Sequence, residues 1–205
     1  MSIPLVIKAG TIGALLVTTS NEKQGLRVAD PQAWSWPVAP WRGIRPTISD
    51  GWGSGRDGGA RLHRGVDIMY QRDNHNPAPQ FRPGTHDASK GFYAPPGTPI
   101  YAAHDGMVWS TGQTARGYSI VIDHGPPWAT FYQHLESIAV TATKHGQSKQ
   151  HVSRGQLIGI MGYSHTDGEQ LRHLHFEIWH GGARLPAVDP APIMRDWQHL
   201  PSWGL

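Results

Sequence analysis

The sequence contains no cysteine, so neither a disulfide framework nor a thiolate metal site is possible. Any bound metal ion must therefore be held by histidine and carboxylate side chains. Charged residues are also few, at 16% of the 205 residues, and no run of Lys or Arg indicates nucleic-acid binding. The net charge of +3 would still assist approach to an anionic surface such as a bacterial envelope.

The sequence also lacks an uninterrupted hydrophobic run. Residues 1–20 are apolar, but Lys8, Gly10 and Gly13 break the stretch, which is too short for a membrane span. No positive side chain precedes this apolar region, so it is a poor match to an export signal. We expect a β-prone arm here, with a membrane anchor or an uncleaved export signal as the alternative.

Glycine and proline, in contrast, are abundant, with 25 and 17 residues. This composition is typical of many short strands joined by tight turns and predicts a mainly β protein with little helix. We expect one domain over residues 45–192, which contains a polar, Pro-rich insertion at residues 71–93. Residues 1–44 form the arm and a Trp/Pro-rich extended segment, whose aromatics we expect to cover the sheet edge rather than line a groove. Residues 193–205 form a tail.

Two short patterns stand out among the thirteen histidines. His173 and His175 lie in an apolar, β-prone run, and alternate residues of a strand share one face. His63 and Asp67 are four positions apart, an even spacing, so an extended backbone there would also place them on one face. The remainder of the chain is interpreted as a scaffold that brings the two pairs together.

These residue types are suited to zinc chemistry. A hydrolytic zinc site commonly has three protein ligands and one open position. His63 and Asp67 with either His173 or His175 would supply those ligands. The ion would bring the pKa of its bound water towards about 7. The remaining histidine of the second pair, or His134 on a neighbouring predicted strand, would take the proton of the attacking water.

Two further side chains are assigned from strand parity. Glu177 falls on the face of His173 and His175, where it could accept a hydrogen bond from an imidazole N–H. Tyr132 falls on the face of His134 and could donate a hydrogen bond to a developing oxyanion.

The patterns are part of an ordered series. The series along the chain is His63-Arg64-Gly65-Val66-Asp67-Ile68, Ala94-Pro95-Pro96-Gly97-Thr98-Pro99, Val121-Ile122-Asp123-His124-Gly125, Tyr132-Gln133-His134-Leu135, Gly155-Gln156-Leu157-Ile158-Gly159, His173-Leu174-His175-Phe176-Glu177 and Val188-Asp189-Pro190. Taken together over about residues 45–192, these motifs resemble the lysostaphin-type (LytM-like) zinc endopeptidases of bacterial cell walls.

The resemblance implies a fold and an activity. The fold is a compact antiparallel β-sheet, a duplicated-hybrid-like β fold, with a groove walled by loops. One zinc ion per chain would be held by His63, Asp67 and His175, and the catalytic histidines would be His134 and His173. The reaction would be hydrolysis of peptide bonds in the stem peptides or cross-bridges of peptidoglycan, outside the cytoplasmic membrane.

The insertion at 71–93 and the polar segment 164–172 depart from the family pattern, so the cleaved bond stays open. The missing export signal motivates the hypothesis of a phage-encoded enzyme, carried in the virion or released at lysis. Its N-terminal arm would then dock on a virion or envelope protein. The rival functions are a non-catalytic wall-binding or activator module, and a virion structural component with secondary wall hydrolysis.

Overall fold

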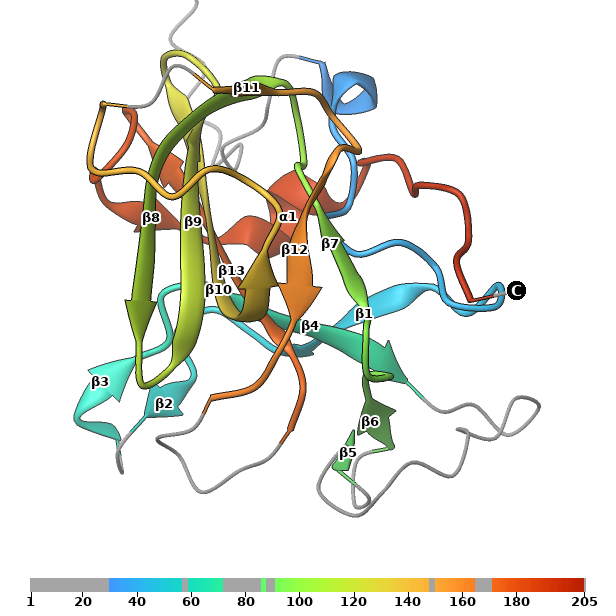
Figure 1. Cartoon of the computed structure of the whole chain (residues 1–205). Helices are drawn as coiled ribbons and strands as arrows, with labels where there is room; N and C mark the ends of the chain where they lie inside the picture. Colours follow the sequence, from blue (N-terminus) through green and yellow to red (C-terminus); the bar gives the residue numbers. More distant parts are fainter. Residues whose placement is uncertain are drawn as a thin grey trace, which may run out of the picture.

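The computed structural model describes residues 30–56, 59–71, 86–87, 91–147, 150–164 and 171–204. The expected arm at residues 1–20 and most of the 71–93 insertion lie outside the described residues. Figure 1 shows strands as the dominant element. The strands are β1 (Pro46–Asp50), β2 (Gly55–Arg56), β3 (Arg61–Leu62), β4 (Val66–Gln71), β5 (His86–Asp87), β6 (Phe92–Tyr93), β7 (Pro99–Tyr101), β8 (Gly106–Thr114), β9 (Gly117–Asp123), β10 (Trp128–Ile138), β11 (His151–Val152), β12 (Leu157–Met161), β13 (Leu174–His180) and β14 (Ala187–Val188).

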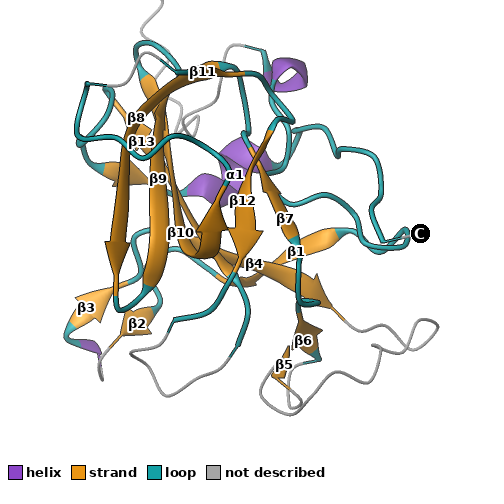
Figure 2. Cartoon of the chain, viewed as in Figure 1, coloured by secondary structure: helices purple, strands orange, loops and turns teal. Residues whose placement is uncertain are grey.

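The strands form one twelve-stranded sheet and a small hairpin of β2 with β3. The main path of the sheet is β11-β8-β9-β10-β13-β4-β6-β5, and every strand pair in it is antiparallel. The expectation of a mainly β, antiparallel fold is confirmed. Figure 2 shows how little helix accompanies the sheet in the described residues. Helical segments there are the 3-10 turn η1 (Pro31–Ala33) and the five-residue helix α1 (Pro190–Met194). None of the described helices is long and apolar enough to cross a membrane.

The hydrophobic core lies on one face of the central strands. Leu174, Phe176 and Ile178 of β13 are fully buried. They alternate with His175, Glu177 and Trp179, which face the other way. Thr130 and Tyr132 of β10 are buried on the same core face. This alternation is the two-residue period of a strand with one face packed against the interior. The opposite face of β13 is therefore the one that carries His175.

The segments that flank the predicted domain contribute to this core. Trp34 and Trp41 are buried, as is Trp197 near the other end of the chain. The rings of Trp34 and Trp197 stack with their centroids 4.9 Å apart. β-Bridges join the two segments at Ser35 with Gln198 and at Trp41 with Trp203, so they run side by side along the sheet (Figure 1). These tryptophans bury apolar area in the core and do not line a groove.

A buried chain of hydrogen bonds crosses the core beneath β10. The Ala103 N–H donates to the Tyr132 hydroxyl, which lies 3.0 Å from the Thr130 hydroxyl. Thr130 Oγ1 lies 2.7 Å from His124 Nε2, while His124 Nδ1 lies 2.8 Å from the Asp105 carbonyl. The Nδ1–H of a neutral His124 donates to that carbonyl, and its Nε2 accepts from Thr130. An uncharged His124 fits this chain when the Tyr132 hydroxyl donates to Thr130, and burial lowers the pKa of His124 and so favours this uncharged form.

The free energy of unfolding should consequently decrease as the pH is lowered, because His124 resists protonation in the folded protein. Burial lowers the pKa of His124 to about 4, whereas an unfolded histidine titrates near about 6.5. Between these values the unfolded chain binds the extra proton, so the free energy of unfolding decreases as pH falls from about 6.5 to about 4. The contribution of this residue is at most about 3 kcal/mol. Urea unfolding across this range should show a weaker pH dependence in His124→Gln than in the wild type. Identical pH dependences would contradict the assignment.

Candidate active site

The pairing of β4 with β13 places Asp67 directly opposite His175. Residues opposite each other on antiparallel strands have Cβ atoms about 5 Å apart on one face. His63 precedes β4 and is held by the adjoining turn. Its backbone N–H donates to the Ser54 carbonyl at 2.9 Å, and its ring Nδ1 lies 2.9 Å from the Gly51 carbonyl. This turn directs His63 Nε2 towards Asp67 and His175.

The three side chains meet at one point. His63 Nε2 lies 2.8 Å from His175 Nδ1, and Asp67 Oδ1 lies 3.1 Å from each of these nitrogens. Each residue offers one ligand atom, and these atoms all lie within 4.8 Å of one another. Ligand atoms on a tetrahedral ion with bonds of about 2.0 Å are roughly 3.3 Å apart, so the cluster fits one small metal ion.

The tautomers imposed by neighbouring groups also suit a cation. His63 Nδ1–H donates to Gly51, which leaves the electron pair of Nε2 directed into the cluster. His175 Nε2 lies 3.1 Å from Glu177 Oε1, so its Nδ1 is the nitrogen that faces Asp67. Three electron pairs therefore converge on a space that must hold either a proton or a metal ion.

Electrostatics confirm that the cluster favours positive charge. Burial opposes ionisation of Asp67, but hydrogen bonds from His175 and His63 outweigh it and lower the pKa of Asp67 well below its usual range. Burial also opposes ionisation of His175, and for a histidine this lowers the pKa. The hydrogen bonds to Asp67 and Glu177 more than offset this effect and raise the pKa of His175 to about 9.

Glu177 makes the contact that strand parity predicted, because its carboxylate accepts from His175. The second oxygen accepts from Trp179 Nε1 at 2.6 Å. The ring of Trp179 stacks in turn on Phe131 of β10, with centroids 5.7 Å apart. Glu177 is thus held in place while it fixes the tautomer of His175.

The other two predicted histidines lie beside this cluster. The rings of His134 and His173 have their centroids 4.6 Å apart, and His173 Nε2 lies 4.0 Å from Asp67 Oδ1. His134 Nδ1 is 2.9 Å from the Arg116 carbonyl, and His173 Nδ1 is 3.0 Å from the Leu171 carbonyl. In both residues the Nδ1–H donates to a backbone oxygen, so Nε2 carries the electron pair. Burial, reinforced by His173, lowers the pKa of His134 to about 3.

The prediction for Tyr132 is wrong. Its hydroxyl bonds to Ala103 and Thr130 inside the core, and burial raises the pKa of Tyr132 to about 12. The reason is a β-bulge: the pairing of β10 shifts register between Gln133 and Leu135, and His134 has a φ of 66°. The bulge reverses the parity of His134, so His134 and Tyr132 face opposite sides.

Sequence reasoning did not identify Phe131 and Gln133 as site-facing residues. With regular pairing up to the bulge, Gln133 lies opposite His175 and Phe131 opposite Glu177. The alternation of a regular strand up to Gln133 would have placed both side chains on the site face. The sequence gives no sign that the bulge begins after Gln133.

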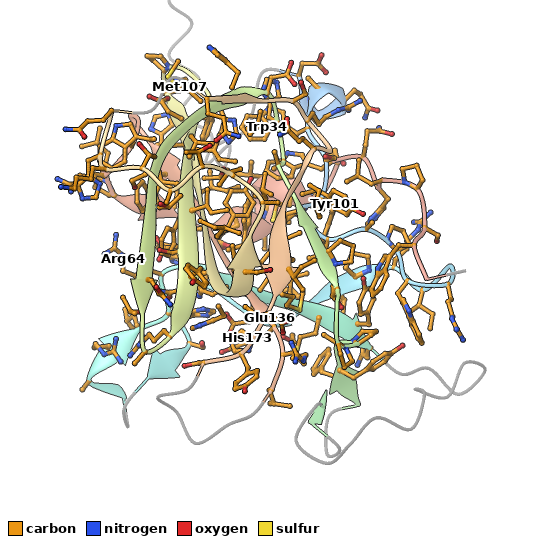
Figure 3. All side chains as sticks on the ribbon, in the orientation of Figure 1. Trp34, Arg64, Tyr101, Met107, Glu136 and His173 are labelled. Atoms are coloured by element: carbon orange, nitrogen blue, oxygen red, sulfur yellow. The ribbon has the colours of Figure 1, made fainter. Side chains whose placement is uncertain are left out.

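Two pockets flank the cluster on different sides. A pocket of about 440 Å3 includes His63 in its lining, and it is formed by the β2–β3 hairpin and the turn after β13. A second pocket of about 500 Å3 is lined by Tyr118, Glu136, Tyr163 and Arg172, among others. Arg172 is paired with Glu136 there. Figure 3 shows His173 and Glu136 near each other at the lower end of the sheet, with Arg64 farther towards the β2–β3 side.

An antiparallel sheet that gathers two histidines and an aspartate at one point, beside two more histidines, has the architecture of a metallopeptidase domain. The sequence profile of peptidase family M23 matches residues 87–190, half of the chain, and the chain belongs to this family. The matched residues include His134, His173 and His175. His63 and Asp67 precede them, on the far side of the insertion.

Similar proteins extend the comparison. The chain is 42% identical over 99 residues to the uncharacterized lipoprotein YgeR of Escherichia coli, covering 47% of this chain and 35% of that protein. It is 42% identical over 88 residues to the peptidoglycan DD-endopeptidase ShyA of Vibrio cholerae, covering 42% of this chain and 19% of that protein. The crystal structure of a zinc-containing peptidase from Vibrio cholerae matches with a TM-score of 0.51 and 26% identity, covering 78% of this chain and 39% of that chain. This chain therefore spans about a third or less of the curated relatives' lengths.

The close approach of β4 to β13 should be sensitive to substitution at Gly65. A Cβ at this position would lie 2.4 Å from the Phe176 carbonyl oxygen, so the strands would have to separate. Gly65→Ala should lower the free energy of unfolding by about 1–3 kcal/mol. It should also weaken metal binding by at least about tenfold, because it displaces Asp67 relative to His175.

Thermal unfolding and calorimetric metal titration would measure both effects. Gly51→Ala is the matched control for stability, since a Cβ there meets nothing within 4 Å. If Gly65→Ala and Gly51→Ala were equally stable, the close strand contact would not constrain the site.

Proposed function

We propose that the protein is a zinc-dependent endopeptidase that hydrolyses peptide bonds in the stem peptides or cross-bridges of peptidoglycan. The observation that carries the proposal is the convergence of His63, Asp67 and His175 beside the neighbouring rings of His134 and His173. Membership of peptidase family M23, the resemblance to a peptidoglycan DD-endopeptidase and the likeness to a zinc-containing peptidase support the same conclusion.

One zinc ion per chain would be held by His63 Nε2, Asp67 Oδ1 and His175 Nδ1. These atoms carry electron pairs that face one another, as described above. When bound, zinc supplies Lewis acidity, which polarises a carbonyl oxygen and makes water more acidic. Glu177 would keep His175 in the tautomer that binds through Nδ1, because it accepts from the other ring nitrogen.

The two remaining histidines would handle the proton and the developing negative charge. Burial, reinforced by His173, lowers the pKa of His134 to about 3, so near neutral pH its Nε2 is available to accept a proton from the attacking water. His173 lies beside His134 and Asp67 and, once its Nε2 carries a proton, would donate a hydrogen bond that stabilises the oxyanion. The carbonyls of Arg116 and Leu171 hold the two rings through Nδ1–H, so Nε2 is the reactive nitrogen of each ring.

We assign catalysis to residues 45–192, with the flanking segments supporting the core through Trp34, Trp41 and Trp197. The site of action would be the cell wall outside the cytoplasmic membrane. Delivery by a phage particle stays a prediction. Deletion of residues 1–30 should leave hydrolysis intact, and loss of the protein from particles would then support a docking arm. Unaltered incorporation would contradict that role.

Purified peptidoglycan sacculi offer the decisive assay. The zinc-loaded wild type should release peptides that mass spectrometry identifies, and a chelator should abolish the release. His63→Ala should lose both zinc and activity. His134→Ala should retain zinc but lose about a thousandfold in rate, because general acid–base catalysis typically contributes about 10²–10⁴-fold.

His151→Ala is a suitable control, since His151 is exposed on β11, away from the cluster. Zinc binding without turnover on any wall type would favour the non-catalytic wall-binding or activator module. Neither zinc binding nor turnover would refute the proposed enzyme.

A further inference from the structure

The pocket beside His63 is unusually apolar for an open surface. Four large apolar side chains are exposed in the described part of the chain, and three of them line this pocket: Trp52, Leu62 and Leu185. Leu62 has 67% of its surface exposed. Grouped exposed apolar side chains of this kind mark binding sites more often than isolated ones do.

The far wall of the pocket is built by a constrained turn. Gly181, Gly182 and Arg184 all have positive φ, at 105°, 113° and 72°. A Cβ on Gly181 would lie 2.5 Å from Leu185 Cδ1, so Leu185 folds directly over this glycine. The turn therefore holds Leu185 and Arg184 at the pocket by its backbone conformation.

Among the described residues that line the pocket, the charge is positive. Arg64 and Arg184 line it, and none of the described lining residues is acidic. Asp50 lies 3.8 Å from His63 Nδ1, on the opposite side of that ring from the cluster, and does not line the pocket. Within the described part of the chain, neither arginine is paired with a carboxylate. The Arg184 guanidinium instead lies 5.0 Å from the centre of the Trp109 ring, which orients it without neutralising it.

Two guanidinium groups beside aliphatic and indole surface suit a carboxylate with an apolar neighbour. The same lining disfavours a group that carries its own ammonium, such as the end of a diaminopimelate or lysine side chain. Because His63 belongs to both the pocket and the proposed zinc site, an occupant of the pocket would be part of the bound substrate.

We propose that this pocket binds the free α-carboxylate of the D-glutamate residue in the peptidoglycan stem peptide. The inference rests on the proposed function. Arg64 and Arg184 would pair with the carboxylate, while Trp52, Leu62 and Leu185 contact the glutamyl methylenes and the adjacent L-alanine methyl. The γ-linkage of this residue leaves its α-carboxylate free in every unmodified stem. Amidation to isoglutamine would remove the charge that the pocket recognises.

A binding experiment tests the pocket independently of hydrolysis. The probes are N-acetyl-L-alanyl-D-glutamate γ-methylamide, in which the γ-carboxyl is an amide as in the stem, and the matching isoglutamine compound, titrated by NMR into the full-length, zinc-loaded protein. The carboxylate form should bind about tenfold more tightly than the isoglutamine compound. Arg64→Gln and Arg184→Gln should each remove most of this preference. Arg195→Gln, which neutralises an exposed arginine outside the pocket, should leave it unchanged.

Leu185→Ser separates the apolar from the charged contribution. It should weaken both probes to a similar extent and preserve their ratio, because the leucine contacts only apolar atoms. Equal affinity of the wild type for the two probes would overturn the proposal. Tighter binding of D-alanyl-D-alanine than of the glutamate probe would also overturn it, since the recognised carboxylate would then be the stem terminus.

A turnover experiment distinguishes this proposal from the proposed function. Cross-linked muropeptides that carry D-glutamate should have a kcat/KM about tenfold higher than those that carry isoglutamine, with the ratio reduced in the two arginine variants. Equal hydrolysis of both substrates would contradict the proposed carboxylate pocket but would be consistent with the proposed endopeptidase activity. Selective binding of the glutamate probe without any hydrolysis would sustain the pocket and refute the enzyme.

Discussion

The site depends on the antiparallel contact between β4 and β13. This pairing sets Asp67 opposite His175, two residues that are 108 positions apart in the chain. The strands can approach because Gly65 presents no side chain to Phe176. The core face of the same strands is filled by Ile68, Leu174 and other buried apolar residues, so burial of the core fixes the register. A shift of one residue would exchange the histidine face with the apolar face.

The second requirement is the β-bulge of β10 at His134. Up to Gln133, β10 pairs regularly with β13, so its core-facing residues anchor the strand. The bulge then turns His134 out of the core and places it against His173, where Arg116 holds its ring. Bulges reorient single side chains without disturbing the rest of a strand. One irregular residue therefore separates the packing role of β10 from its contribution to the site.

Strand periodicity was sufficient to place Glu177 with His175. It also grouped His63 with Asp67, although His63 lies in the turn before β4 and is held there by Ser54 and Gly51. It failed at Tyr132 because the conformation of His134, a histidine with a φ of 66°, is imposed by pairing with β9 and β12 and has no local sequence signal. The pocket beside His63 was equally inaccessible to sequence reasoning. Its walls are turns more than a hundred residues apart, and their meeting depends on the completed sheet.

Burial lowers the pKa of both His134 and His175, but the net shifts of the two pKa values are opposite. For His134 burial, reinforced by His173, outweighs the opposing effects of the Arg116 hydrogen bond and of Asp67 and lowers its pKa. For His175 the carboxylates of Asp67 and Glu177 outweigh burial and retain a proton. A metal ion at the cluster would replace that proton and satisfy the same electron pairs, since metal binding and deprotonation of the ligand are coupled. The neutral His134 is not one of the three residues that would bind the proton or the metal ion. It therefore remains available as a base when a cation occupies the cluster.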